Sequence, residues 1–140
     1  MENYIQSAPH AFMHITIDDI KPIRGRIYNA AIKDPIEFVD FNELIINADH
    51  MFNNIGNPMP SVQLRSFRYK KAKINYQASP KLYHDYHDLR TIPGKKTSLD
   101  IYLKSRHEAS WQGYLMVKGK SFIFHGIMEL LKVMNTEVLS

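Results

Sequence analysis

A basic segment in the middle of the chain holds the densest set of side chains suited to binding. Between Arg65 and Lys73, five cations are interleaved with two aromatic residues. Cations can pair with backbone phosphates, and aromatic rings can stack on unpaired bases. The segment is therefore a candidate nucleic-acid-binding site, which Lys95 and Lys96 would extend. Its candidate residues are Arg65, Phe67, Arg68, Tyr69, Lys70, Lys71, Lys73, Lys95 and Lys96.

The basic segment also has an interpretation that needs no ligand. Residues 61–69 alternate as a strand does, and Arg65, Phe67 and Tyr69 would share one face of it. Lysines on an edge strand prevent sheets from aggregating edge to edge. The sequence leaves both interpretations open.

Titratable residues are densest in the sequence His84-Asp85-Tyr86-His87-Asp88. On a helical turn, His84 and His87 would face the same side and could bind a transition metal together with a carboxylate. The simpler interpretation is a connector whose polar residues face water, because no second cluster of ligands follows. We therefore predict no metal site and no cofactor.

Local signatures of catalysis are missing from the sequence. It has no Gly-x-Ser-x-Gly, Walker, Gly-x-Gly-x-x-Gly or His-Glu-x-x-His motif, and no cysteine. We predict a protein that is not an enzyme. An active site assembled from distant residues, in a cleft between two halves of the chain, stays open as a third interpretation.

The N-terminal part predicts three strands followed by a helix. Apolar and other residues alternate over 11–17, and further strands are expected at 25–31 and 36–39. Asp40 and Glu43 have the spacing of a capping box, and apolar residues follow at helical spacing to Ile55. We predict a helix over 41–55.

The remainder of the chain predicts a connector and then the same order of elements. Residues 70–97 read as a long connection, with one helical turn near 82–89. Strands are expected at 99–103, at 111–117 and around Phe122 to Phe124, with a tight turn at 118–120. A helix should begin after Gly126.

The two ends of the chain predict an internal duplication. With a shift of 86 residues Phe38 meets Phe124 and Glu43 meets Glu129, and with a shift of 88 Gly25 meets Gly113. With the same shift of 88, Met13 would meet Ile101. Two βββα units, at 11–56 and 98–140, would then share one core through a pseudo-two-fold axis, with a basic connector at 57–97.

Three short motifs lie in the C-terminal third: Ala109-Ser110-Trp111-Gln112-Gly113, then Phe122-x-Phe124, then Glu129-Leu130-Leu131. With these motifs the C-terminal third resembles a group of small uncharacterised bacterial proteins. That group has a similar Ser-Trp-Gln-Gly strand, a Phe-x-Gly or Phe-x-Ser hairpin and a Glu-Leu-Leu helix. The sequence Arg65-Ser66-Phe67 is also similar. The resemblance supports the architecture and implies no catalytic residue.

Composition is consistent with one domain over residues 1–140. The net charge is +4, and it is unevenly distributed: −4 over residues 1–56, +7 over 57–97 and +1 over 98–140. No apolar run approaches the roughly 20 residues needed to span a bilayer, and no signal peptide is visible. We expect a cytoplasmic protein that does not contact a membrane.

The sequence thus predicts an α+β fold of duplicated βββα units, with antiparallel sheets packed against two helices. The leading functional prediction is a non-enzymatic binding or regulatory protein that contacts nucleic acid or a nucleoprotein through its basic middle. The alternative is a protein–protein interaction module, such as a homodimer or a small inhibitor or accessory protein from a mobile element.

Overall fold

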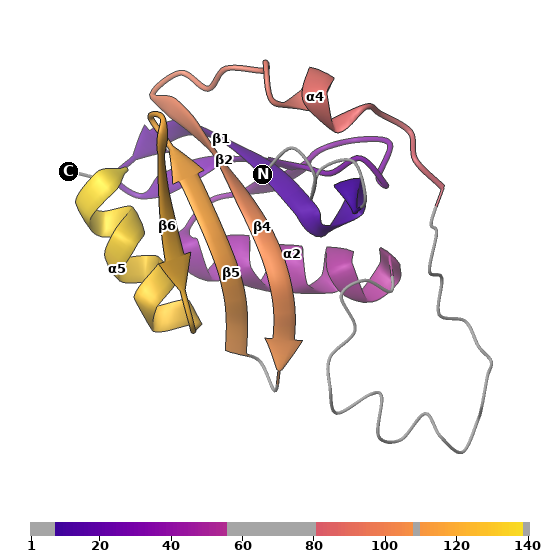
Figure 1. The fold of residues 1–140 in the computed structure, drawn as a ribbon. Coiled ribbons are helices and arrows are strands. Elements are labelled where there is room, and N and C mark those ends of the chain that lie inside the picture. Colours follow the sequence, from indigo (N-terminus) through magenta and orange to yellow (C-terminus); the bar gives the residue numbers. More distant parts are fainter. Residues whose placement is uncertain (1–7, 56–80, 108–109, 139–140) are drawn as a thin grey trace.

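The computed structural model describes residues 8–55, 81–107 and 110–138, which form an α+β fold around one six-stranded antiparallel sheet. The strand order is β3-β2-β1-β4-β5-β6, so the sheet is continuous (Figure 1). We predicted antiparallel sheets, and the described residues form a single sheet because β1 and β4 pair with each other in the middle. In chain order the elements are η1 (Pro9–Ala11), β1 (Phe12–Ile20), β2 (Ile23–Tyr28), β3 (Ile36–Phe38), α2 (Phe41–Ile55), α4 (Tyr86–Leu89), β4 (Thr97–His107), β5 (Ser110–Val117), β6 (Lys120–Phe124) and α5 (Ile127–Glu137).

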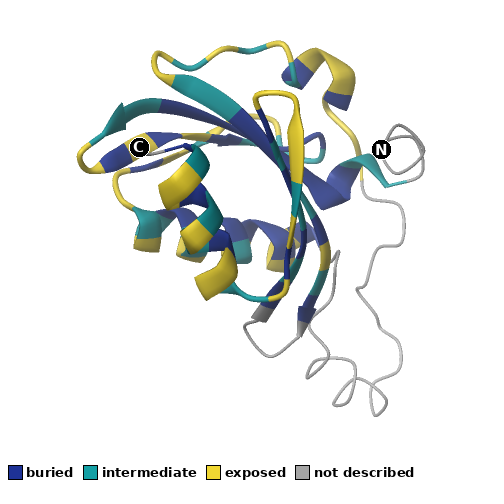
Figure 2. Ribbon diagram, turned by 60° about the vertical axis from the view of Figure 1, so that its left-hand side comes forward, coloured by how far each residue is buried: buried dark blue, intermediate teal, exposed yellow. Residues whose placement is uncertain are grey.

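Helices α2 and α5 cover one face of the sheet. Their buried side chains, such as Leu44, Phe52 and Leu130, form one cluster with alternate residues of the strands, such as Ile15 and Ile101. Trp111 is 1% exposed and belongs to the same cluster. Figure 2 shows buried residues in the central strands and exposed residues on the outer sides of both helices.

Helix α2 has the bounds that its sequence predicts. The Asp40 carboxylate accepts a hydrogen bond from the backbone N–H of Glu43 at 2.7 Å, and the Glu43 carboxylate accepts one from Val39 at 3.0 Å. These two bonds satisfy N–H groups that have no partner within the helix. Apolar residues at helical spacing then bury one side of the helix on the sheet.

A buried arginine fastens α2 to β4. Arg106 is 1% exposed, and its guanidinium donates to the carboxylate of Asp49 at 2.9 Å and to the amide oxygen of Asn53 at 3.0 Å. The guanidinium also lies over the ring of Phe52, with 5.7 Å between its carbon and the ring centroid. Burial lowers the pKa of Arg106, while Asp49 acts in the opposite direction.

Strand β1 is buried on both faces, which its alternating sequence does not predict. Met13, Ile15 and Ile17 pack against the helices, whereas His14 and Thr16 on the other face are only 1% and 2% exposed. The strand also continues through Asp18 and Asp19, beyond the alternation that predicts it over 11–17. A register shift between Ile17 and Asp19 accommodates the change, and the strand stops at Ile20.

Most of the other predicted elements are present with altered bounds. The strand expected at 99–103 is the longer β4, and the strand expected at 25–31 ends earlier as β2. The helical turn expected near 82–89 is α4, which has four residues. The predicted strand at 61–69 lies outside the described residues. No helix in the described ranges is long and apolar enough to cross a membrane.

Candidate functional site

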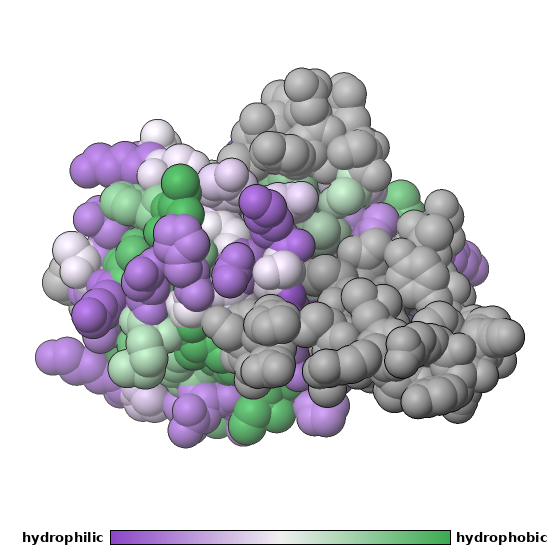
Figure 3. Space-filling view, turned by 60° about the horizontal axis from the view of Figure 1, so that its bottom comes forward, coloured by the Kyte–Doolittle hydropathy of each residue, from purple (hydrophilic) through white to green (hydrophobic). Residues whose placement is uncertain are grey.

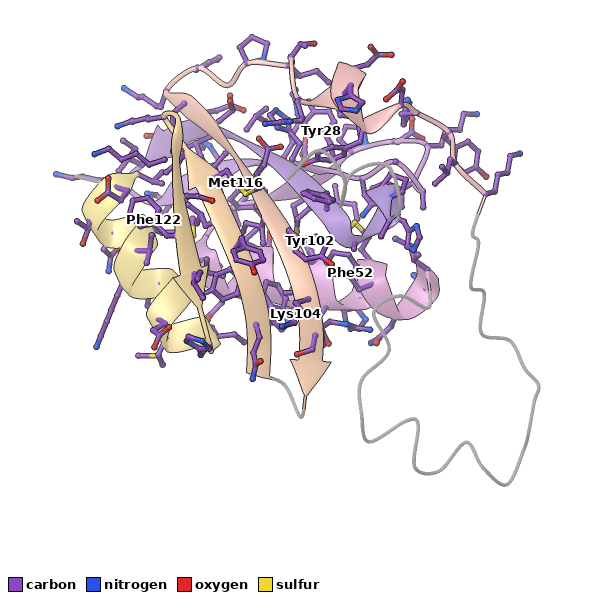
Figure 4. All side chains as sticks on the ribbon, viewed as in Figure 1. Tyr28, Phe52, Tyr102, Lys104, Met116 and Phe122 are labelled. Carbon is purple, nitrogen blue, oxygen red and sulfur yellow. The ribbon has the colours of Figure 1, made fainter. Side chains whose placement is uncertain are left out.

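The open face is the face of the sheet turned away from α2 and α5. It carries Phe12, His14, Tyr28, Asp100, Tyr102, Lys104, Tyr114 and Met116, from strands β1, β2, β4 and β5. Figure 4 shows Tyr102, Lys104 and Met116 on β4 and β5, with Phe52 of α2 on the other side of the sheet. Of the described α-helices, only the short α4 packs on the open face.

The connector over residues 81–97 crosses part of the open face. The backbone N–H of Tyr83 donates to the carbonyl of Ala30 at 2.7 Å, and that of Lys96 donates to the carbonyl of Ile17 at 2.8 Å. Between these two attachments, Tyr86 and Leu89 of α4 are buried with Phe12 and Ala30 in a second, smaller core. The connector therefore covers the β1 half of the open face.

Asp100 is the centre of a buried polar network beneath the connector. Its Oδ1 lies 2.9 Å from Nδ1 of His14 and accepts a hydrogen bond from the Tyr86 hydroxyl at 2.5 Å. Its Oδ2 lies 3.8 Å from Nε of Arg90. Nε2 of His14 donates to the carbonyl of Ile92 at 2.7 Å, because a carbonyl oxygen can only accept. The network thus links β1 and β4 to three positions of the connector.

The environment of Tyr86 keeps its hydroxyl protonated. Burial raises the pKa of this phenol well above its ordinary value of 10.0, and the charge of Asp100 and the hydrogen bond to Asp100 act in the same direction. Arg90 opposes them by a smaller amount. The phenol is therefore a permanent donor to Asp100 at neutral pH.

These contacts give the network a positioning role. Both ring nitrogens of His14 face acceptors of the chain itself, and the ring is 1% exposed, so neither nitrogen is presented to a substrate. The carboxylate of Asp100 is engaged by three residues at once. Such a satisfied network fixes the connector on the sheet.

An aromatic row runs from the connector across the open face. We define the aromatic row as Tyr86, Phe12, Tyr102 and Tyr114: the rings of Phe12 and Tyr86 have centroids 5.2 Å apart, and those of Phe12 and Tyr102 are 4.7 Å apart. Tyr102 and Tyr114 are cross-strand partners that stack with centroids 6.0 Å apart and an interplanar angle of 20°. The row is buried at the connector and partly exposed at its β4–β5 end, where Lys104 is exposed.

A pocket of about 380 Å³ lies where the connector meets the turn after β2. His84, Asp85 and Asp88, from the cluster of titratable residues at 84–88, line part of it, and Nε2 of His84 donates to the carbonyl of Lys33 at 2.9 Å. The carboxylate of Asp85 accepts from the N–H of His87 and caps α4. Within the described ranges, no group of three or more His, Asp or Glu side chains is arranged to hold a metal ion. The cluster thus has structural partners.

Of the predicted nucleic-acid-binding residues, the structure describes Lys95 and Lys96. Both are exposed, and both directly follow Gly94, whose backbone lies against Ile17 of β1. Their backbone is fixed, since Lys95 N–H donates to the carboxylate of Asp18 at 3.1 Å and Lys96 N–H to Ile17. A Cβ at position 94 would collide with the backbone of Thr97 and Ile17, so only glycine fits this close approach. The other seven predicted residues, from Arg65 to Lys73, lie outside the described residues.

Sequence reasoning missed the polar network and the aromatic row. His14 and Asp100 are 86 residues apart. Neither residue belongs to a recognisable motif. The available signal was that His14 and Asp100 are polar residues within two predicted apolar strands. If the two strands pair, both side chains can lie on the same face of the sheet and contact each other.

Comparison with known proteins finds no matching family model, no matching curated protein and no matching solved structure. The resemblance to small bacterial proteins therefore stays a prediction.

Proposed function

We propose that this chain is a non-enzymatic binding protein for single-stranded nucleic acid, free or in a nucleoprotein, acting in the cytoplasm. The basic middle over residues 57–97 would contact phosphates, and the partly exposed end of the aromatic row would stack on bases. This proposal combines the charge of the sequence with the geometry of the open face.

The observation that carries the proposal is the partly exposed end of the aromatic row, at Tyr102 and Tyr114. Tyr102 and Tyr114 stack on a rigid pair of strands, and Lys104 is exposed on the same face. Proteins that bind single strands combine such stacking platforms with a cationic path for the backbone. The connector that crosses this face belongs to the part of the chain with a net charge of +7.

The anchored lysines support the same proposal. Lys95 and Lys96 are held by β1 through their backbone, so their side chains start from fixed positions. A fixed cation loses less conformational freedom on binding a phosphate than one on an unattached chain. The connector thus supplies charge at a defined edge of the open face.

The test is fluorescence anisotropy with a labelled single-stranded oligonucleotide over a series of salt concentrations. We expect binding at low salt that weakens linearly on a log–log plot, because bound phosphates release counterions. Charge reversal at Arg68, Lys70 and Lys71 should abolish it. Tyr114→Leu should weaken binding by about 1–3 kcal/mol through lost stacking.

The single reversal Lys70→Glu should also weaken binding, and its matched control is Lys132→Glu, which reverses one charge on the outer side of α5 and should leave affinity almost unchanged. Absence of binding to both RNA and DNA at low salt would refute the proposal. Equal loss of affinity in the Lys132 variant would show that binding depends only on net charge.

We further propose that the sheet consists of two βββα units related by a pseudo-two-fold axis. Three observations support this. Strand order is symmetric about the β1–β4 pair, and register shifts occur at Ile17/Asp19 and at Leu103/Ser105. In each half a glutamate accepts from the N–H four residues before it, Glu43 from Val39 and Glu129 from His125.

Strand pairing favours one change in the alignment of the two units. The register shifts in β1 and β4 differ by 86 residues, so Ile15 corresponds to Ile101, and Met13 does not. Gly25 and Gly113 still correspond with a shift of 88, since a Cβ at either would collide with the carbonyl of the facing strand, at Thr16 and Tyr102. The two extra residues therefore fall in the hairpin after β4. With this shift His14 corresponds to Asp100, its own pairing partner, so the proposed axis passes through the polar network.

A protein-interaction module is the second candidate function. The observation that favours it is the outermost strand β6, where Ile123 is 60% exposed. At the other edge of the sheet, β3 carries the charged Glu37 at the position that corresponds to Ile123, so β6 is the edge more open to pairing with another chain.

A further inference from the structure

The two edges of the sheet are protected differently. At the β3 edge, the side chain of Asn47 on α2 donates to the carbonyl of Glu37 at 3.0 Å, and the exposed Glu37 carboxylate lies 3.8 Å from Nε of Arg26. A covered carbonyl and a charged side chain are two ways in which proteins block addition of another strand. β3 is also only three residues long.

The β6 edge is less protected: its one charged residue, the exposed Lys120, lies at the turn end of the strand, and Ser121 to Phe124 carry no charge. In the alignment by 86 residues, Ile123 stands in place of Glu37, and Val133 of α5 stands in place of Asn47 and cannot donate a hydrogen bond. Among the described residues, no side chain hydrogen-bonds the backbone of Lys120–Phe124 beyond its pairing with β5. Figure 1 shows β6 as the outermost strand on this side, next to α5. The strand has five residues.

The hairpin before β6 fixes which backbone groups face outward. Lys118 and Gly119 have φ angles of 53° and 77°, as in a two-residue type I′ turn, so Val117 and Lys120 exchange both hydrogen bonds. Hydrogen-bonded and non-hydrogen-bonded pairs alternate along an antiparallel ladder. The backbone N–H and C=O groups of Phe122 and Phe124 therefore bond to β5. Those of Ser121 and Ile123 point away from β5, outward from the edge of the sheet.

We propose that β6 pairs with β6 of a second copy of this chain, antiparallel and centred on Phe122. In this register Ser121 faces Ile123 of the second copy and Ile123 faces Ser121 of the second copy. The four outward groups of each chain are then all used, in four hydrogen bonds. A register shifted by one residue would place outward groups opposite inward ones. The result is a continuous twelve-stranded sheet.

Side chains fit this register on both faces. The two Ile123 side chains become diagonal neighbours on the open face, where each is 60% exposed in one chain. On the helix side, the two Phe122 rings come together, and each is only partly buried against its own core. Antiparallel pairing also separates the two basic hairpins, because Lys120 lies opposite Phe124 of the second copy, which directly precedes His125 and stands five residues before Glu129.

The first test is sedimentation equilibrium on the whole chain and on two isoleucine variants. We expect a monomer–dimer equilibrium, with a dissociation constant about tenfold higher in Ile123→Lys, which puts two like charges on neighbouring positions. Ile46→Lys is the matched control, because Ile46 on α2 is 54% exposed and lies away from the edge. A chain that stays monomeric at millimolar concentration, or equal weakening by both variants, would overturn the proposal.

The second test reads the pairing register by amide hydrogen exchange at residue resolution. Ser121 and Ile123 amides should exchange quickly in dilute monomer and slowly in concentrated dimer, while the Phe122 amide stays protected in both. This alternation is independent of any variant. A dimer whose Ser121 and Ile123 amides remain unprotected would place the contact elsewhere and refute the β6 pairing, whether or not the chain binds nucleic acid.

Discussion

Asp100 is the residue on which the attachment of the connector depends. It accepts from Tyr86, faces Nδ1 of His14 and lies near Arg90; His14, Tyr86 and Asp100 are buried, and Arg90 is partly exposed. Buried acceptors of this kind stabilise a fold only while every member of the network keeps its partner. Two predictions follow from the two sides of the Asp100–Tyr86 hydrogen bond.

Asp100→Ala should lower the free energy of unfolding by about 3–5 kcal/mol, since it leaves His14 and the Tyr86 hydroxyl buried without their partner. Tyr86→Phe should cost only about 1 kcal/mol, because Asp100 keeps its other contacts. Urea unfolding at neutral pH measures both values. Equal costs for the two variants would show that Asp100 is not the centre of the network.

The raised pKa of Tyr86 predicts a loss of stability in alkali. Below pH 10 the phenol is protonated in both the folded and the unfolded chain. Above pH 10 only the unfolded chain ionises, so the free energy of unfolding falls by at most about 1.4 kcal/mol per pH unit, until the folded pKa is reached. Urea unfolding between pH 9 and 11 should show a shallower fall for Tyr86→Phe. Parallel curves for the two proteins would contradict the assignment.

Among the elements, α2 and β1 show what local sequence can and cannot predict. Helix α2 has its predicted bounds because its cap and its apolar spacing are both local. Strand β1 has the alternation of a half-exposed strand, yet it is buried on both faces. The cover comes from Tyr86, Leu89 and the rest of the connector, whose apolar residues follow no regular period.

Glycine at position 113 sets how closely β5 approaches β4. A Cβ there would collide with the carbonyl oxygen of Tyr102, which is backbone and cannot turn aside. Gly113→Ala should therefore lower the free energy of unfolding by about 1–3 kcal/mol, the usual cost of overpacking. Gly119→Ala is the comparison, because its φ of 77° costs about 1 kcal/mol while nothing lies within 4 Å of the added Cβ. Thermal unfolding that ranks Gly119→Ala as the more damaging change would contradict this account of β5.

For the whole molecule, the sequence predicted the class of fold and the order of its elements. It did not predict that β1 and β4 pair, because pairing between strands so far apart leaves no local pattern. The candidate site shows the same limit. Lys95 and Lys96 were predicted from their local charge, and the structure gives their backbone defined positions. The aromatic row was not predicted, because it joins four residues that are distant in the sequence.

Hydrophobic side chains on the side of the molecule shown in Figure 3 lie interspersed with polar ones on its described part. The exposed apolar residues of the described ranges include Ile46 of α2, Ile123 of β6 and Met128 of α5. Scattered apolar residues of this kind are normal on protein surfaces. Ile123 differs from the others because it lies on a strand edge with unused backbone groups.

The measurement that tests the central claim most directly is a titration of the isotope-labelled chain with a single-stranded oligonucleotide, followed by amide chemical shifts. The account predicts that shifts concentrate on the open face at Tyr102, Lys104 and Tyr114 and in the basic middle, including Lys95 and Lys96. The amide signals of residues on the outer sides of the helices, such as Ile46 and Met128, should keep their chemical shifts. Shifts confined to α2 and α5, or none at saturating oligonucleotide, would contradict the proposed nucleic-acid interface.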